Sequence, residues 1–461
     1  MVTYQDLLTV GNSDDDRIKF VKDTINKHKS SSLYETAEIA YQYDRKQNVT
    51  ILNYEKTFTT LTGRIVRDDY TPNHKVISNF FDRFVVQQNQ FLLGNGVTWS
   101  KESKTADALG KDFDTILQKA GKDALIGGVS FGFWNLDHLE KFTITEFAPL
   151  WDEENGSLRA GIRWWQIDAN KPLRATLYEE DGYTEYIWRK DKPDGEVLKE
   201  KQPYIINVRT TVIDGTEIMS GENYPTFPIV PFWGNPQHQS ELVGLRDGID
   251  AYDLIKNGFE NDLDNAQMYW IIKGAGGMDD PDLARFLERL KKVKAAAPAD
   301  GQEVEAVTLD LPYEAREKLL ERIKNDLYDD YMALDVKSIA SGAATATEIR
   351  AAYEPMNTKA DQYEYCVIEF IQGILRVAGL EDDPTFTRSM LINTQEEVQT
   401  VLQAAQYLPE DYVTEKLLTI LGDGDKVQDI LNQKAADELS RANDIDAEEG
   451  EEDAEDEDVN E

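Results

Sequence analysis

The sequence has few of the residues that build disulfide frameworks and metal centres. It contains one cysteine, Cys366, and four histidines that lie far apart among its 461 residues. A single cysteine excludes an intrachain disulfide framework and a cysteine-rich metal site. Because no two histidines share the short spacing of a zinc motif, we expect no metal centre.

Basic residues are scarce relative to acidic ones. Lysine and arginine total 49 and aspartate and glutamate total 87, which gives a net charge of −38. A protein that grips nucleic acid over a broad surface needs clustered lysine and arginine, so this balance argues against that class. It remains compatible with a protein that DNA passes without adhering. No apolar run reaches the length of about 18 residues that crosses a membrane, so we expect no membrane partner.

Motifs of common catalytic sites are absent as well. Gly110-Lys111 and Gly121-Lys122 are each followed by aspartate and lack the upstream glycine of a phosphate-binding loop. The sequence also lacks the Gly-x-Ser-x-Gly motif of serine hydrolases. These absences predict a protein that is not an enzyme and needs no cofactor.

The periodicity of apolar residues indicates an α+β fold in which helix predominates. Spacings of three and four predict helices in the first 120 residues, including one over residues 73–93. Residues 125–233 alternate in polarity between turn pairs such as Asp181-Gly182, which is typical of antiparallel hairpins. Helical periodicity returns after Pro236.

Two long helices with an insert between them follow residue 236. An unbroken apolar stripe predicts a helix from Glu241 to Ile272, which would be about 48 Å long. Seven acids and two bases between Glu241 and Asn265 give this stretch a charge of −5. A second stripe predicts a helix over residues 312–335, and the pair predicts an antiparallel stalk with a small cap.

The insert reverses the charge of the chain locally. A helix is expected over Pro281–Lys294 and a short strand over Val304–Leu309. Five bases and one acid lie between Ala284 and Ala297, which gives +4. The bases are Arg285, Arg289, Lys291, Lys292 and Lys294.

A segment of small residues separates the stalk from the C-terminal helices. Residues 336–346 are nearly uncharged, and the next helix, over residues 347–378, contains Pro355 and should kink there. Shorter helices are expected over residues 394–406, 409–421 and 425–441. The last 18 residues, 444–461, carry 12 acids and no base, which predicts a disordered tail.

Four stretches carry a family resemblance. They are residues 73–97, which include Phe91-Leu92-Leu93-Gly94, and residues 227–242, 252–264 and 341–349. In order and spacing they resemble the portal (head–tail connector) proteins of long-tailed bacteriophages, in the branch common among phages of Gram-positive hosts. Phe91 stands where that family has tyrosine, and the proline that follows its Tyr-Leu-Leu-Gly motif is missing.

The resemblance implies a ring, normally of twelve copies, at one capsid vertex of the virion, assembled in the host cytoplasm. Double-stranded DNA would pass through it during packaging and ejection. The implied parts are a wing (1–236 with the helix 347–380), a first stem helix (237–272), a clip (273–311), a second stem helix (312–335), a tunnel loop (336–346) and a crown (381–443), followed by the acidic tail (444–461). The implied partners are the terminase large subunit, which is the separate ATPase, a head–tail adaptor, and the major capsid and scaffolding proteins.

The same resemblance implies three groups of functional residues. The channel constriction would be Val336, Lys337, Ser338, Ile339, Ala340, Ser341, Gly342 and Ala343 of the tunnel loop. The stem helix would line the channel with Asp247, Asp250, Asp253, Asn257, Asn261 and Asp264. The five bases of the insert would dock the terminase or adaptor, or instead balance acids on the next subunit. Lys337 would touch phosphates lightly, or instead pair with a neighbouring acid as an exposed loop lysine.

Two other functional classes stay open at this point. An acidic DNA-mimic or chaperone-type binding protein would use the charge of −38 to engage basic partners, but it leaves the stalk unexplained. A nuclease would hold a metal ion with Asp247, Asp250 and Asp253, although a solvated helix face explains their spacing more simply. The acidic tail is interpreted as a solubility tail, or as a segment at the channel mouth that repels DNA or engages scaffolding protein.

Overall fold

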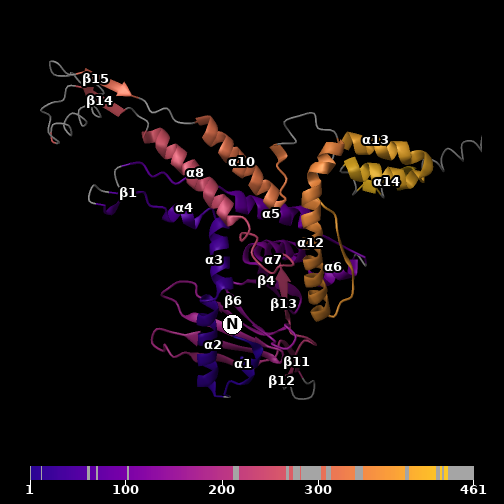
Figure 1. The fold of residues 1–461 in the computed structure, drawn as a ribbon. Helices are drawn as coiled ribbons and strands as arrows, with labels where there is room; N and C mark the ends of the chain where they lie inside the picture. Colours follow the sequence, from indigo (N-terminus) through magenta and orange to yellow (C-terminus); the bar gives the residue numbers. More distant parts are fainter. Residues whose placement is uncertain are drawn as a thin grey trace, which may run out of the picture. The chain divides into compact units, whose positions relative to one another are not determined.

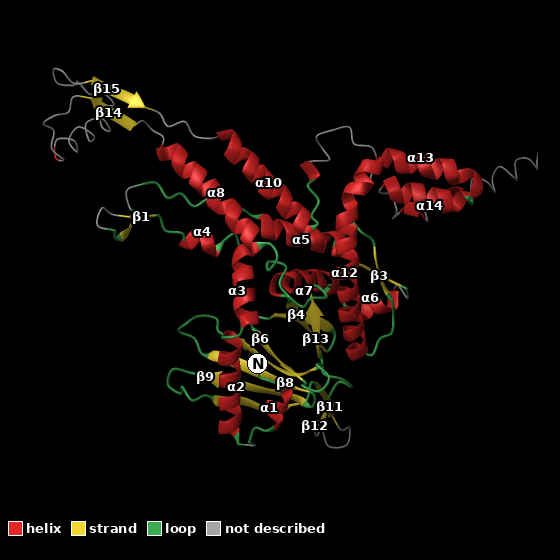
Figure 2. Cartoon of the chain, in the orientation of Figure 1, coloured by secondary structure: helices red, strands yellow, loops and turns green. Residues whose placement is uncertain are grey.

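The computed structural model describes most of the chain up to residue 434. The described residues are 2–11, 13–59, 63–68, 71–100, 103–210, 217–265, 269–273, 281, 303–307, 313–337, 346–389, 394–421, 426–427 and 430–434. The chain divides into two compact units, residues 1–335 with 354–389 and residues 336–353 with 390–461. The elements combine antiparallel sheets with a larger share of helix (Figures 1 and 2), which confirms the mixed helix and sheet content.

The first unit begins with four helices, and the first two of them pack on an antiparallel sheet. These helices are α1 (Tyr4–Leu8), α2 (Asp14–Lys29), α3 (Ser32–Asp44) and α4 (Val49–Asn53). The Ser13 side chain caps α2 by accepting the Asp16 N–H at 3.2 Å, as a serine before an acidic first turn predicts. Val21 of α2 packs with Ile162 and Leu177 of the sheet in one apolar core.

The predicted β region forms two main sheets. The larger is a five-stranded meander in the order β10-β9-β8-β7-β6, and a three-stranded sheet runs β13-β4-β5. The strands are β4 (Val129–Asn135), β5 (His138–Thr143), β6 (Phe147–Trp151), β7 (Leu158–Trp165), β8 (Leu173–Glu179), β9 (Gly182–Trp188), β10 (Glu196–Gln202) and β13 (Ile229–Trp233). A separate hairpin pairs β11 (Ile205–Thr210) with β12 (Glu217–Glu222). The antiparallel hairpins expected over residues 125–233 are therefore confirmed.

Three helices carry the central core. They are α5 (Phe80–Leu93), α7 (Phe113–Gly127) and α12 (Ala346–Ala378), and their buried residues share one apolar cluster. α5 begins at Phe80 and not at Asn73, so the helix expected over residues 73–93 is seven residues too long at its start. Around the core lie α6 (Ser103–Leu109) and the paired strands β3 (Val97–Trp99) and β16 (Pro384–Phe386).

The stalk consists of α8 (Arg246–Asn265) and α10 (Tyr313–Tyr331). α8 ends at Asn265, so the prediction of a helix that continues to Ile272 was wrong. The 20 residues of α8 give it a length of about 30 Å. Tyr269–Lys273 forms strand β14, which pairs with β15 (Glu303–Val307). The aromatic and β-branched residues of Tyr269-Trp270-Ile271-Ile272 favour a strand over a continued helix. β15 confirms the strand expected near Val304, and α10 confirms the second stalk helix.

α12 spans 33 residues and contains Pro355, as expected. The boundary between the two units falls inside it, between Tyr353 and Glu354. In the second unit α13 (Thr394–Ala404), η1 (Ala405–Tyr407) and α14 (Glu410–Leu421) agree with the two helices expected over residues 394–421. Residues 430–434 are helical, and the acidic tail lies outside the described residues. Within the described part of the chain, no helix has the length and apolar character to cross a bilayer.

Candidate functional site

The candidate site is the stalk and the segments that anchor its base. α8 and α10 lie side by side (Figure 1) and are antiparallel, because the end of α8 contacts the start of α10. The Phe259 and Tyr313 rings meet edge to face at 5.1 Å, and Arg316 pairs with Asp262 at 2.7 Å. At the other end, apolar residues of both helices and of the segment before α8 join the central core. They are Leu242 and Leu245 before α8, Ile249 of α8, and Leu327, Tyr328 and Tyr331 of α10.

One face of α8 holds an extended stretch of chain through a ladder of side chains. Asp253, Asn257 and Asn261 lie at intervals of four residues on this face. Their Oδ1 atoms accept the backbone N–H groups of Ser78 at 2.9 Å, Val76 at 2.6 Å and His74 at 2.8 Å. Four helical residues rise about 6 Å. Two residues of an extended chain rise about 6.6 Å. The four-residue spacing on α8 therefore matches the two-residue spacing of His74, Val76 and Ser78.

Further hydrogen bonds complete this ladder. The Asn257 amide also donates to the Val76 carbonyl at 2.9 Å and to the Asp253 carbonyl at 2.7 Å. The Asn48 amide donates to Asp253 Oδ2 at 2.6 Å. Asp253, Asn257 and Asn261 are 0%, 2% and 1% exposed. Burial raises the pKa of Asp253, and the hydrogen bonds from Asn48 and Ser78 oppose that shift.

The ladder explains why the helix predicted from residue 73 begins at Phe80. The N–H groups of His74, Val76 and Ser78 bond side chains of α8 and so are not available to a helix. The apolar spacing of Val76 and Phe80 is compatible with a helix, but contacts with residues more than 170 positions away decide the conformation.

The ladder also corrects the expected roles of the polar face of α8. The prediction that Asp253, Asn257 and Asn261 lie on a solvated, channel-lining face is wrong within this protomer. All three side chains are buried against residues 73–79. Asp250 is half-buried and accepts hydrogen bonds from Tyr43 at 2.5 Å and Thr50 at 2.6 Å.

Two channel-lining expectations on α8 remain as predictions. Asp247 is exposed on α8, so its position is compatible with a channel wall. The side chain of Asp264 lies outside the described residues.

The hypothesis of a nuclease metal site on α8 loses support from the same hydrogen bonds. The carboxylates of Asp250 and Asp253 accept hydrogen bonds from hydroxyl, amide and backbone N–H groups. These hydrogen bonds occupy the oxygens that would have to coordinate a metal ion. In the part of the chain that the structure describes, no cluster of three or more histidine, cysteine, aspartate or glutamate residues is arranged to hold a metal ion.

The chain leaves α10 through a fixed turn. Met332 takes a left-handed conformation with φ of 61°, and the N–H groups of Met332 and Ala333 bond the carbonyls of Asp329 and Tyr328. This is a Schellman cap, with methionine at the position that usually holds glycine. The amide of Gln87 on α5 then donates to the Leu334 carbonyl at 3.0 Å and accepts the Leu334 N–H at 3.2 Å.

The segment expected to form the channel constriction begins two residues later. Val336 and Lys337 are exposed. Ser338, Ile339, Ala340, Ser341, Gly342 and Ala343 lie outside the described residues. The structure therefore shows a constrained entry to this segment, and the role of the segment itself stays a prediction.

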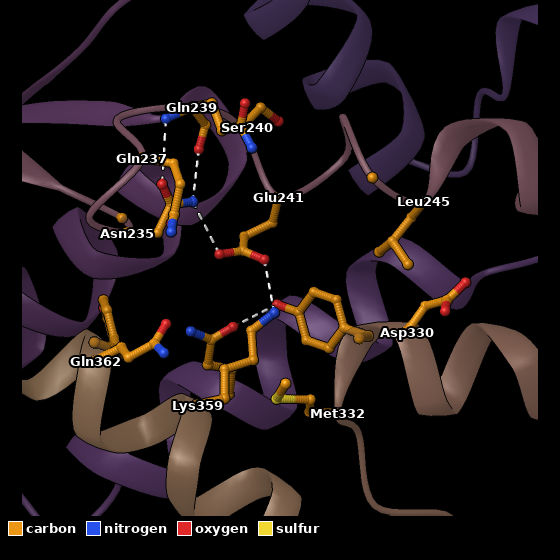
Figure 3. A pocket seen from close by; sticks show the side chains of 15 residues that line it. Asn235, Gln237, Gln239, Ser240, Glu241, Leu245, Asp330, Met332, Lys359 and Gln362 are labelled. Carbon is orange, nitrogen blue, oxygen red and sulfur yellow. Dashed lines mark hydrogen bonds and ion pairs between the residues drawn. The ribbon is translucent and has the colours of Figure 1, made fainter.

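A polar pocket of about 190 Å³ lies where the segment 234–245 before α8, the end of α10 and α12 meet (Figure 3). Lys359 of α12 pairs with Glu241 at 2.7 Å, with side chains 17% and 11% exposed. The Lys359 ammonium also lies 3.4 Å from the centre of the Tyr331 ring. The Asn235 amide donates to the other Glu241 oxygen at 3.0 Å. Lys359 therefore ties α12 to the segment that leads into α8 and to the end of α10.

Sequence reasoning missed this ion pair and the ladder. The ladder has a signal in the sequence, since Asp253, Asn257 and Asn261 are short hydrogen-bonding side chains at intervals of four on one helix face. The Glu241–Lys359 pair has no such signal, because 118 residues separate its members. The five expected docking bases, Arg285, Arg289, Lys291, Lys292 and Lys294, lie outside the described residues.

Comparison with known proteins gives relatives of one kind. The portal protein of Bacillus phage SPP1 is 24% identical over 378 residues, which cover 76% of this chain and 73% of that protein. The portal protein of Clostridium phage phiCD119 is 25% identical over 197 residues, which cover 40% of this chain and 44% of that protein, less than half its length.

Solved structures give a more distant likeness. The neck of an empty GTA particle, computed with C6 symmetry, matches with a TM-score of 0.40 and 12% identity, covering 74% of this chain and 90% of that chain. The neck of a native GTA particle, computed with C12 symmetry, matches with a TM-score of 0.39, also at 12% identity, covering 74% and 89%.

A family model extends over most of the sequence. The model described as "Phage portal protein, SPP1 Gp6-like" matches residues 22–439. The two named phage relatives agree with it. The chain therefore belongs to the SPP1 Gp6-like family of phage portal proteins.

Proposed function

We propose that this chain assembles as a ring, normally of twelve copies, around a channel at one capsid vertex. Double-stranded DNA is packaged and ejected through that channel. Family membership supports this proposal. The structural observation that carries it is the α8–α10 stalk, whose second helix leads through a fixed turn into the segment 336–346.

Within this proposal the stalk is the stem and the segment 336–346 is the tunnel loop. Residues 1–236 with the 347–380 helix form the wing, 273–311 the clip and 381–443 the crown. The Schellman cap and the two Gln87 hydrogen bonds hold the entry to the tunnel loop in place. A narrow channel needs such an anchor, because a loop whose first residues drift cannot set a reproducible width.

The charge of the chain suits DNA that slides without binding. Its excess of 87 acids over 49 bases repels phosphate at long range, because the bases are too few to neutralise the acids. Lys337 is the base within the expected constriction, and it contacts phosphates lightly and transiently in this proposal.

The clip serves as the docking platform. Its bases, which include Lys291 and Lys292, face acidic surfaces of the terminase large subunit or the head–tail adaptor. The terminase supplies the ATPase, and this chain acts as a structural component of the virion and not as an enzyme. Assembly with the major capsid and scaffolding proteins takes place in the host cytoplasm.

Negative-stain microscopy and light scattering of the purified protein test the ring. Twelve copies of the 52.4 kDa chain have a mass of about 630 kDa, and top views should show an annulus. Monomers in every condition, including within virions, would overturn the proposal and favour an acidic binding protein.

A packaging assay tests the clip separately. Lys291→Glu with Lys292→Glu should impair DNA filling of capsids while leaving rings intact. Normal filling by this variant would remove the docking role.

A further inference from the structure

α5 carries three consecutive polar residues where it packs in the central core. Gln88 and Asn89 are each 3% exposed, and Gln87 beside them is half-buried. The neighbouring turns of α5 bury Phe84 and Leu92 almost completely. A buried polar group is costly unless it is hydrogen-bonded, so these three side chains need partners.

Gln87 and Gln88 bind the two sides of one turn. Gln88 Oε1 accepts the hydroxyl of Tyr331, the last residue of α10, at 2.6 Å. Gln87 holds both backbone groups of Leu334, three residues further along the chain. Met332, the residue with the left-handed backbone, lies between these two contacts. α5 therefore fixes the chain immediately before and immediately after the point where it leaves α10.

Asn89 makes a contact of the same chemistry with a different element. Its Oδ1 accepts the Tyr363 hydroxyl of α12 at 2.9 Å, and its amide donates to the Gln118 carbonyl of α7 at 2.9 Å. Tyr363 is 0% exposed and Tyr331 is 1% exposed. The two tyrosine hydroxyls are thus equally buried and bind the same kind of acceptor on α5, but only Tyr331 lies at the end of α10.

Apolar packing also joins the end of α10 to α5. The Phe84 ring stacks on Tyr331 at 4.9 Å and meets Tyr328 edge to face at 5.0 Å. Apolar attraction is non-directional, so it holds the two helices together but tolerates small shifts of one along the other. An O–H···O hydrogen bond requires a separation of about 2.5–3.0 Å and a nearly linear geometry. The bond from Tyr331 to Gln88 therefore selects one register of α10 on α5.

The other polar contacts at this end of α10 do not replace that bond. The Lys359 ammonium lies over the face of the Tyr331 ring, an attraction that does not involve the hydroxyl. Asp335 pairs with Lys324 of α10 itself, so this ion pair ties the chain after the turn to α10 and not to α5. Among the described contacts, the Tyr331 hydroxyl bonds Gln88 alone.

We propose that Gln88 is a positioning residue for the expected channel constriction. Through Tyr331 it sets the register of the last turn of α10, and thereby the point from which the segment 336–346 starts. Gln88 itself touches neither this segment nor DNA in this proposal. The inference rests on the proposed function, which places the segment 336–346 at the constriction.

Two tyrosine variants test the positioning role in the assembled protein. Tyr331→Phe and Tyr363→Phe each remove one buried hydroxyl and leave one amide oxygen of α5 without its donor. Both should lower the melting temperature to a similar extent. Hydrogen–deuterium exchange over residues 332–334 should accelerate about fivefold in Tyr331→Phe, the effect of losing one hydrogen bond, and should stay unchanged in Tyr363→Phe. Equal acceleration in both variants, or none in Tyr331→Phe, would overturn the inference.

A double variant separates positioning from stability. Gln88→Met with Tyr331→Phe replaces both partners by apolar side chains of similar shape, an exchange that can be nearly neutral for stability. We expect intact rings and a melting temperature close to that of the unmodified protein, with exchange over residues 332–334 still as fast as in Tyr331→Phe. A return of slow exchange together with the melting temperature would show a purely structural role and would overturn the inference.

A packaging assay connects the register of α10 to the channel. Capsids that carry the double variant should fill with less DNA than capsids that carry Tyr363→Phe. If capsids with the unmodified protein take up no DNA, the proposed function fails. If they fill normally and the double variant fills as well as Tyr363→Phe, only the positioning role of Gln88 fails.

Discussion

Replacing Asn257 by alanine should release residues 73–79 from α8. The Asn257 side chain is 2% exposed and accepts from Val76 at 2.6 Å while donating to the Val76 carbonyl at 2.9 Å. Asn257→Ala leaves both backbone groups of Val76 without these partners. An unsatisfied group that is buried costs about 1–3 kcal/mol, and Val76 is half-buried. We therefore expect the local opening free energy of this segment to fall by about 2–4 kcal/mol.

Hydrogen–deuterium exchange of the assembled protein measures this change. A drop of about 2–4 kcal/mol should accelerate exchange of the amides over residues 73–79 by about 30-fold to 1,000-fold. Asn261→Ala should have a smaller effect, because Asn261 provides only the bond to the His74 N–H among the described contacts. Asn325→Ala is the matched control, since Asn325 is exposed on α10.

Two results would refute the reasoning about the ladder. Unchanged exchange over residues 73–79 in Asn257→Ala would show that the side-chain bonds do not hold the segment. An equal acceleration in Asn325→Ala would show a general loss of stability instead of a local release.

Three further predictions concern the fold around the stalk. Lys359→Met should lower the free energy of unfolding by about 3 kcal/mol, because it leaves Glu241 charged, largely buried and without its ion-pair partner. Adding Glu241→Gln should recover part of this loss of stability, as measured by thermal unfolding. Burial lowers the pKa of His28, so the unfolded chain binds a proton below about pH 6.5 that the folded chain does not. Stability should therefore fall between pH 7 and pH 5 in urea unfolding, and less steeply in His28→Gln. Gly121→Ala should cost about 1–3 kcal/mol, since the added Cβ would overlap the Tyr363 hydroxyl, and a normal melting temperature would contradict this.

Much of the helical architecture could be predicted from local patterns. α10, α13 and α14 begin and end close to the expected positions, because each has an apolar stripe with clear boundaries. α12 follows its 3-4 repeat in spite of Pro355. These elements agree with the sequence because local preference and tertiary packing favour the same conformation.

The errors arose where distant residues decide the conformation. Residues 73–79 have helical spacing, yet the ladder on α8 supplies partners for an extended backbone. The end of α8 was placed too late because the apolar stripe continues into Tyr269-Trp270, which instead pair with β15. A period of apolar residues cannot distinguish these cases, because a short apolar run is compatible with either a helix or a strand.

The structure also changes the electrostatic reading of α8. The sum of −5 between Glu241 and Asn265 includes every acid in this stretch, as if each one were free to repel phosphate. Glu241 is paired with Lys359, and Asp262 is paired with Arg316 from another helix. Asp253 is fully buried behind residues 73–79.

In the proposed ring, repulsion of DNA by the stem would therefore depend on fewer acids than the sequence count implies. Asp247 is exposed and Glu260 half-exposed, and no ion pair is recorded for either within the described residues. A channel wall with few strong charges binds neither cations nor phosphates tightly. Such a wall lets DNA slide in both directions, because neither attraction nor strong repulsion sets a barrier to its passage.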